Sequence, residues 1–220
     1  EKKVGGGIED SELIEGLLLD KERVHGNMPN KIENAKIALI DIPLEIKDTE
    51  IDAKIQITDP SQLQSFVDQE EKILKKMVDC IISSKANVVF CQKGIDDIAQ
   101  HFLSKSGIYA VRRVKQSDMR KLQRATGGKI VNSLKDLREK DLGSSGLVEE
   151  KKIGGEEMTY VTNCNNPKAV TLFIRGGTEH VIAEIERAIK DALGDISASL
   201  KIGKVVAGAG SPEIELSRKL

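Results

Sequence analysis

A glycine pair separates a short apolar run from a helical pattern in the last third of the sequence. The segment Ile174-Arg175-Gly176-Gly177-Thr178 joins a predicted strand to a predicted helix, and such a junction can present backbone amides to a phosphate. It lacks the lysine and the spaced glycines of the P-loop nucleotide motif. We therefore interpret it first as a tight structural turn and keep an α/β phosphate-ligand domain as an alternative.

Residues typical of metal sites and nucleophilic catalysis are scattered. His25, His101 and His180 lie far apart, and neither an H-E-x-x-H run nor a C-x-x-C pair accompanies them. No G-x-S-x-G elbow is present. The three cysteines each lie in an apolar stretch, where a free cysteine behaves as a small hydrophobe. The sequence thus predicts no metal site, no hydrolase and a reducing, cytoplasmic location.

A local excess of basic residues lies between Lys105 and Lys129, with Asp118 as the only acid. The whole chain has 34 basic and 35 acidic residues and a net charge of -1, so no global field attracts nucleic acid or anionic membrane. Without interleaved aromatic residues, we favour a solvated or subunit-contact face. The alternative is a nucleic-acid module that would bind through Arg112, Arg113, Lys115, Arg120 and Arg124.

A long helix is predicted from Pro60 to about Ser84, after an alternating strand over 51–57. The polar run 68–72 separates its first apolar cluster from the longer stripe that starts at Ile73. This first cluster is either an exposed tip or part of the core beneath a helix that lies flat on the sheet. The candidate tip residues, including one from the preceding strand, are Ile57, Leu63, Phe66 and Val67.

Strands and helices alternate after residue 87, which favours a parallel sheet and an α/β fold. The predicted strands are Val88–Cys91, Ile108–Val111 and Lys129–Val131, and the predicted helices are Ile95–Ser104 and Asp118–Ala125, the latter capped by Ser117. In the first helix, Ile95, Ile98, Ala99 and Phe102 are expected in the core. Its expected outward face contains Asp97, Gln100, His101 and Ser104.

The flanking segments complete the predicted fold. We expect strands at Leu13–Leu19, Lys36–Asp41 and Ala169–Ile174, and a hairpin formed by Leu147–Ile153 and Met158–Cys164. Thr178 is expected to cap a helix that runs to about Leu193, and Ser211 to cap a last one.

Several sequence motifs together cover nearly the whole chain: Val24-His25-Gly26-Asn27-Met28-Pro29, 33–39, 87–92, Lys93-Gly94-Ile95-Asp96-Asp97, 98–101, Ala110-Val111-Arg112-Arg113-Val114, 166–168 and 174–180. In these motifs the chain resembles the apical domains of group II chaperonins of the archaeal thermosome type. The resemblance implies an apical domain over 9–177, with β-sheets flanked by helices and a helical protrusion over about 48–84. Residues 1–8 and 178–220 would be intermediate-domain segments.

The resemblance also implies a function in protein folding. Non-native polypeptide would bind the outward face of the helix around Asp97–Ser104 and the four tip residues, and the protrusion would serve as a built-in lid. The partners would be client polypeptides and other subunits of a double ring, with no nucleic acid and no membrane.

Nucleotide chemistry is implied for the full-length subunit alone. The family's Gly-Asp-Gly-Thr-Thr nucleotide signature is absent from these 220 residues. We expect this segment to bind no cofactor and not to hydrolyse ATP by itself. Because the chain opens with Glu1 rather than methionine, we interpret it as a piece of a longer protein. That full-length subunit is expected to bind ATP and Mg²⁺. Asp191 matches the aspartate that helps hydrolysis in the family.

Overall fold

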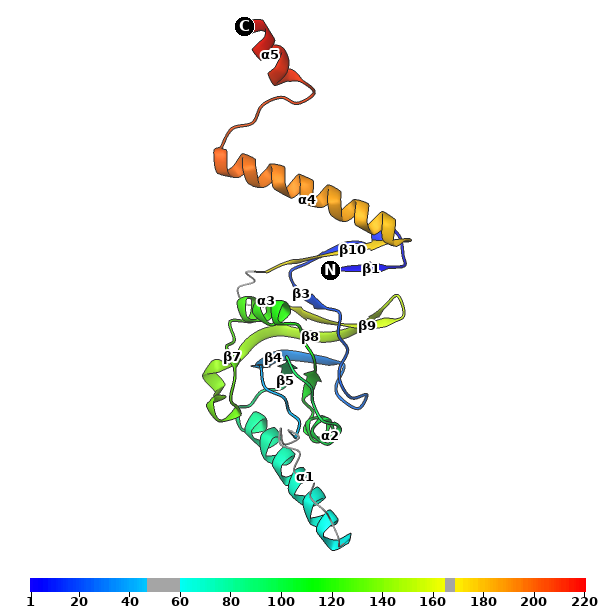
Figure 1. Cartoon of the computed structure of the whole chain (residues 1–220), viewed down its shortest axis with the longest axis vertical. Coiled ribbons are helices and arrows are strands. Elements are labelled where there is room, and N and C mark those ends of the chain that lie inside the picture. Colours follow the sequence, from blue (N-terminus) through cyan, green and yellow to red (C-terminus); the bar gives the residue numbers. More distant parts are fainter. Residues whose placement is uncertain (47–59, 165–168) are drawn as a thin grey trace. The chain divides into compact units, whose positions relative to one another are not determined.

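The computed structural model describes residues 1–46, 60–164 and 169–220, and for 60–67 the backbone alone. The chain divides into two compact units (Figure 1). The larger comprises Glu12–Phe173 together with Glu1, and the smaller comprises Lys2–Ser11 and Ile174–Leu220. The assignment of apical and intermediate domains, with boundaries after residues 8 and 177, stays a prediction.

The larger unit is built on a mixed sheet with the strand order β3-β9-β8-β4-β5-β6, and β7 also pairs with β4. Strands β4, β5 and β6 are parallel, as is the pair β4 and β7, which confirms the α/β fold predicted from the alternating pattern. The bounds are β3 Gly16–Leu19, β4 Lys31–Ile40, β5 Val88–Cys91, β6 Tyr109–Val111, β7 Ile130–Val131, β8 Gly143–Ile153 and β9 Glu156–Thr162.

Apolar residues fill both faces of this sheet. In β4, Ile37 and Leu39 belong to one buried cluster and Ala38 and Ile40 to another, because successive strand side chains point to opposite faces. Two helices, α1 (Pro60–Ser83) and α2 (Asp97–Lys105), contribute to the cluster that contains Ala38 and Ile40. The opposite cluster contains residues of α3 (Gln116–Thr126), so helices cover both faces.

Two predicted helix starts are wrong by two residues. Asp96 caps α2 by accepting a hydrogen bond from the Ile98 amide, so the helix begins at Asp97 rather than Ile95. The N-cap of α3 is Lys115, not Ser117. The predicted end of α3 is close to the observed one, because Gly127 adopts the left-handed conformation (φ 75°) that terminates helices.

The apolar run at 13–19 forms two strands rather than one. β2 (Glu12–Ile14) and β3 are separated by Glu15, directly before Gly16, which has φ 153°. β2 pairs with the first half of β10 (Thr171–Gly176), whereas β3 pairs with β9. The break therefore lets one apolar segment contribute to two sheets.

The smaller unit contains β1 (Lys2–Val4), which pairs in parallel with Ile174–Gly176 of β10, and two helices. α4 (Glu179–Ile202) begins at the predicted cap, Thr178, but continues past the predicted end at Leu193 and stops at left-handed Gly203. Glycine inside a helix costs only about 1 kcal/mol, so Gly194 does not end it. α5 (Ser211–Lys219) follows with Gly210, not Ser211, as its N-cap.

Short 3-10 turns complete the described chain at Ile8–Asp10, Leu134–Asp136 and Glu139–Asp141. No helix among the described residues is both long and apolar enough to cross a membrane.

Candidate functional site

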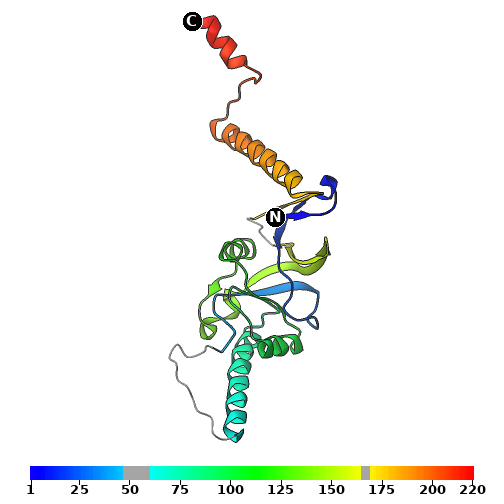
Figure 2. The same cartoon turned by 45° about the vertical axis from the view of Figure 1, so that its right-hand side comes forward.

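The exposure of α1 changes sharply along its length. Residues 68–73 are all exposed, although the last of them is Ile73, at 47% exposure. From Leu74 onward the helix has a buried stripe, continued by Val78 and Ile81. That spacing of four and three residues is one helix face packed against the sheet. The amino-terminal part of α1 extends beyond the sheet (Figure 2).

The predicted tip residues belong to this part of the chain. Ile57 lies outside the described residues, and the side chains of Leu63, Phe66 and Val67, in the first turns of α1, lie outside the described side chains. Their exposure therefore stays a prediction. Because residues 68–73 are exposed, α1 packs against the core only from Leu74 onward. This supports the interpretation of the first apolar cluster as a tip over that of a helix lying flat on the sheet.

α2 presents a mixed polar and apolar surface. Asp97 and His101 are exposed and Ser104 is half-buried. Gln100 was expected to face outward, but it is only 4% exposed. Its side-chain amide donates to the Ile95 carbonyl oxygen at 2.8 Å and to Asp97 Oδ1 at 3.0 Å, so its polar atoms are satisfied inside the protein.

The same correction applies to the predicted core face of α2. Ala99 and Leu103 are fully buried, whereas Ile98 is 39% exposed and Phe102 is half-buried. The cap at Asp96 starts the helix later than expected and directs the face of Ala99, Gln100 and Leu103 inward. Recognition of Asp96 as an N-cap would have signalled this shift. The outer face of α2 is therefore less polar than its sequence indicated.

A loop between β3 and β4 lies beside α2. The rings of His25 and His101 approach edge to face, with centroids 6.5 Å apart. Val24 donates its backbone N–H to the Ala110 carbonyl of the outer strand β6 at 2.9 Å. We call residues 21–24 the strap, because they cover the free edge of the sheet.

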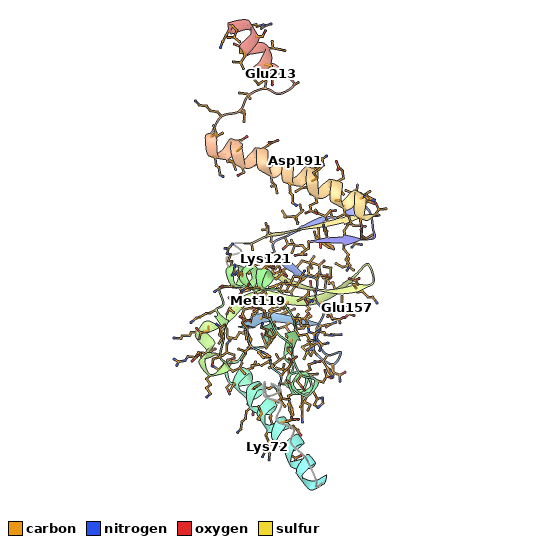
Figure 3. The ribbon with its side chains drawn as sticks, in the orientation of Figure 1. Lys72, Met119, Lys121, Glu157, Asp191 and Glu213 are labelled. Carbon is orange, nitrogen blue, oxygen red and sulfur yellow. The ribbon has the colours of Figure 1, made fainter. Side chains whose placement is uncertain are left out.

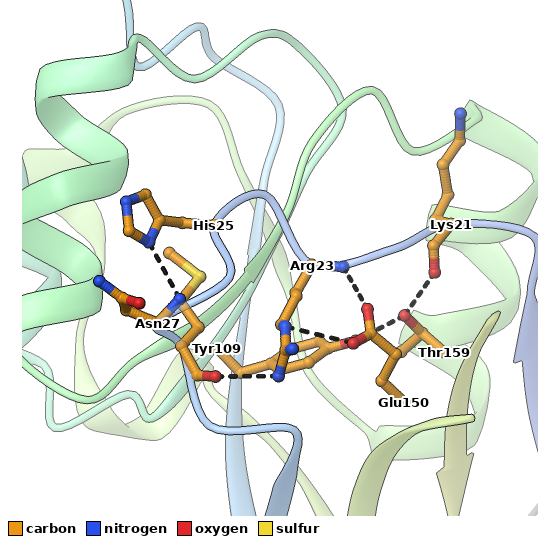
Figure 4. Close-up of polar contacts among 8 residues, drawn as sticks. Lys21, Arg23, His25, Asn27, Tyr109, Glu150 and Thr159 are labelled. Atoms are coloured by element: carbon orange, nitrogen blue, oxygen red, sulfur yellow. Dashed lines mark hydrogen bonds and ion pairs between the residues drawn. The ribbon is translucent and has the colours of Figure 1, made fainter. Parts of the chain in front are cut away.

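Three further contacts fix the strap (Figure 4). The Arg23 backbone N–H donates to Glu150 Oε1 at 2.7 Å, and its guanidinium lies 3.2 Å from Glu150 Oε2. The Thr159 hydroxyl donates to the Lys21 carbonyl at 2.6 Å and lies 2.7 Å from the Tyr109 hydroxyl oxygen. Burial raises the pKa of Tyr109. Sequence patterns gave no signal for this network, because its members come from four distant segments.

The glycine junction at 176–177 has a structural explanation. A side chain at Gly176 would approach Ile182 Cγ1 to 3.0 Å, so glycine permits close packing of α4 on β10. The Thr178 hydroxyl already accepts from the Val181 amide, and Arg175 donates to the Gly5 carbonyl. Gly176 thus serves the packing of α4 on β10, which supports the interpretation of the junction as a structural turn.

Asp191 lies on the exposed surface of α4 (Figure 3), where its Oδ2 is 3.3 Å from Arg187 Nη1. Neighbouring charges on this helix form similar pairs. Hydrogen bonds from Lys190 and from Lys2 of β1 lower the pKa of Glu186 to about 2. Within the described residues, no three His, Cys, Asp or Glu side chains gather as a metal site would require. Asp191 thus takes part in a surface ion pair with Arg187.

The basic residues of the 112–124 segment divide between two elements. Arg112 and Arg113 follow β6, whereas Arg120 and Arg124 are exposed on α3. Lys121 of α3 contacts Asp118 and Glu1, and the hydrogen bond that it donates to Asp118 is the main cause of its raised pKa. The predicted basic face is therefore interrupted by ion pairs.

Comparisons with known proteins agree with the fold. A family model described as the TCP-1/cpn60 chaperonin family matches residues 1–220. The chain is 61% identical to a thermosome subunit of Methanopyrus kandleri and 60% identical to the thermosome subunit beta of Archaeoglobus fulgidus, over all of this chain and 40% of each relative.

A solved structure extends this likeness to three dimensions. The chain matches the open-state monomer of a group II chaperonin from Methanococcoides burtonii with a TM-score of 0.81 and 48% sequence identity, over 100% of this chain and 48% of that one. The chain thus spans less than half the length of these relatives. With this agreement of sequence over every residue and of fold, the chain belongs to the TCP-1/cpn60 family and is a group II chaperonin sequence.

Proposed function

We propose that this chain is the client-binding and lid-forming segment of a group II chaperonin subunit. The observation that carries the proposal is the exposure of residues 68–73 of α1, directly ahead of Leu74. Fourteen residues separate Pro60 from Leu74, a rise of about 21 Å at 1.5 Å per residue. We call residues 60–73 of α1 the arm. A helix of that length can hold apolar side chains away from the sheet that supports it.

Client binding requires apolar surface that its own chain does not bury. Ile98 of α2 supplies some, beside half-buried Phe102, and both lie on the same helix face as exposed His101. Leu63, Phe66 and Val67 would add apolar surface on the arm. Burial of client apolar area stabilises such a complex by about 25 cal/mol per Å². Asp97, His101 and Ser104 would supply polar contacts, whereas buried Gln100 would support the helix.

Enclosure of the client would need the rest of the subunit and its neighbours. In a double ring in the cytoplasm, ATP-driven motion would swing this segment about its glycine-bearing connections near Gly5–Gly7 and Gly203–Gly210, and the arms of adjacent subunits would converge. ATP and Mg²⁺ would bind outside this chain, since these 220 residues lack the family's Gly-Asp-Gly-Thr-Thr nucleotide signature. Asp191 would assist hydrolysis only in that assembly.

The test is suppression of aggregation by the 220-residue chain. A chemically unfolded protein is diluted into buffer with and without the chain, and light scattering is followed. We expect suppression by the wild type and its loss in the double variant Leu63→Ser, Phe66→Ser. A second variant, Ile98→Ser, tests α2 separately and should retain part of the effect.

The matched control changes two exposed polar residues of the same helix, Gln69→Ser and Lys72→Ser. It perturbs helix propensity similarly but removes no apolar surface, so suppression should persist. Circular dichroism establishes that each variant remains folded. Equal suppression by the apolar and the polar double variants would contradict a client site on the arm.

A phosphate-ligand domain is the competing function. Titration of ATP or inorganic phosphate should leave the melting temperature of this chain unchanged, because the glycine junction lacks the lysine and the spaced glycines of the P-loop motif. A saturable rise in melting temperature would favour the competing function.

A further inference from the structure

We propose that a basic pocket between the strap and the carboxyl end of β6 binds the carboxylates of an acidic polypeptide segment. This inference rests on the proposed function, since the segment would belong to a client. The pocket has a volume of about 200 Å³ and is lined by Lys21, Glu22, Arg23, Val24, Arg112 and Arg113. Four of the six lining residues are cations and one is an acid, so the pocket has a positive charge.

The two arginines that follow β6 are available to a ligand. Arg112 and Arg113 are both exposed, and neither guanidinium pairs with an acidic side chain in the described part of the chain. A guanidinium presents a planar fork of N–H donors that matches a carboxylate in two-point geometry. Glu22 lines the same pocket and reduces its charge without removing the excess of cations.

The wall formed by Arg112 and Arg113 has a strained backbone. Arg113 adopts the left-handed region, with φ 54°, which is unfavourable for a residue with a side chain. The Arg113 amide donates to the Lys93 carbonyl at 2.9 Å, and the Val114 amide donates to the Cys91 carbonyl at 3.0 Å. These bonds hold the turn in place. Such over-determined strain is typical of positions with a binding role.

The opposite wall is equally fixed. The Val24 amide of the strap donates to the Ala110 carbonyl. Glu150 accepts from the Arg23 amide, and the Thr159 hydroxyl donates to the Lys21 carbonyl (Figure 4). The Arg23 Nε forms an ion pair with Glu150, and its Nη1 donates a hydrogen bond to the Met28 carbonyl. These two contacts orient the guanidinium before any ligand binds. A preformed pocket binds with a smaller loss of conformational entropy.

The place of the pocket in the fold agrees with a binding role. In open α/β sheets, ligands bind beyond the carboxyl ends of the parallel strands. Arg112 and Arg113 directly follow β6, and Lys93, which accepts from Arg113, follows β5. A peptide carboxylate suits the pocket better than nucleic acid, because no aromatic side chain lines it to stack on a base.

The test measures binding of a fluorescent octaglutamate peptide to the full chain by anisotropy, with octaglutamine as the neutral probe. We expect octaglutamate to bind, octaglutamine not to bind, and affinity to fall with added salt. The double variant Arg112→Gln, Arg113→Asn should weaken binding about tenfold or more. Asparagine is chosen because it tolerates the left-handed backbone.

The matched control is Arg120→Gln, Arg124→Gln on α3, which removes the same charge outside the pocket and should change affinity less than about twofold. A second pocket variant, Arg113→Gly, preserves the backbone conformation if the asparagine variant fails to fold. Unchanged binding in the pocket variants, or an equal loss in the α3 control, would overturn the proposal.

Three further outcomes separate the alternatives. Tighter binding of a single-stranded oligothymidine than of octaglutamate, lost in the pocket variants, would overturn the proposal in favour of nucleic acid. A chain that suppresses aggregation but does not bind octaglutamate would refute the pocket alone. Octaglutamate binding without suppression of aggregation would support the pocket as a peptide site and refute the proposed function.

Discussion

Glu150 binds both the backbone and the side chain of Arg23, a residue 127 positions away in the sequence. The Arg23 N–H and Nε lie 2.7 Å and 3.2 Å from the two carboxylate oxygens. The Glu150 side chain is only 5% exposed and that of Arg23 is 21% exposed. A largely buried ion pair thus joins the strap to β8, and it supports the wall of the basic pocket.

Removal of this carboxylate should destabilise the protein more than removal of a surface one. Glu150→Ala leaves the buried Arg23 charge without its partner, and we expect a loss of about 3 kcal/mol in the free energy of unfolding. The control is Glu33→Ala, because Glu33 is 68% exposed and pairs with Lys31 on the surface. We expect less than about 1 kcal/mol there. Urea denaturation measures both, and similar losses would contradict a structural role for the pair.

Gly16 should not accept a side chain. Its φ is 153°, and an added Cβ would lie 2.1 Å from the Val161 carbonyl oxygen, an atom of the neighbouring strand that cannot move independently. We expect Gly16→Ala to cost about 3 kcal/mol or more, through displacement of β3 from β9. Gly26→Ala is the control, because no atom lies within 4 Å of its added Cβ. Thermal unfolding distinguishes them, and equal melting temperatures would show that the strand pair relaxes freely.

Stability should fall at alkaline pH partly because of Cys91. Burial raises the pKa of its thiol from 9.0 to about 11. Above pH 9 the thiol therefore ionises in the unfolded state while it stays neutral in the folded state, so this contribution to stability is present below pH 9 and is lost as pH rises to 11. We expect it to amount to about 2 kcal/mol across that interval.

The Cys91→Ala variant isolates this effect. Its cavity should lower stability at every pH, but the decline from pH 9 to 11 should be shallower than in the wild type. Other alkaline groups, such as Tyr109 with its raised pKa, titrate in both proteins and cancel in the comparison. Parallel stability curves over this range would mean that Cys91 does not contribute.

The cap of α2 should affect both stability and client binding. Asp96→Ala removes the acceptor of the Ile98 amide, at 2.9 Å, and should cost about 1 kcal/mol. Fraying of the first turn would also displace Ile98 and His101 and weaken suppression of aggregation. Asp96→Asn keeps an acceptor and should behave like the wild type. If Asp96→Ala suppresses aggregation fully despite lower stability, the first turn of α2 does not contact the client.

The periodic elements of this chain could be predicted from local sequence. β5 was predicted with its observed bounds, and α1 ends within one residue of its predicted end, because a period of two or of 3.6 in apolar residues reports which face is buried. The end of α3 could be predicted in the same way, because glycine readily adopts the left-handed conformation that Gly127 has there. The α/β class and the family resemblance followed from these patterns and from motifs that are contiguous in the chain.

Tertiary structure alone decided which side chains meet. The burial of Gln100 depends on the Asp96 cap and on the Ile95 carbonyl, and the strap depends on Glu150 and Thr159 from distant strands. The basic pocket likewise joins the strap to a turn after β6. Local periodicity contains no information about such pairings, because they are determined by strand order and by the packing of segments far apart in the sequence.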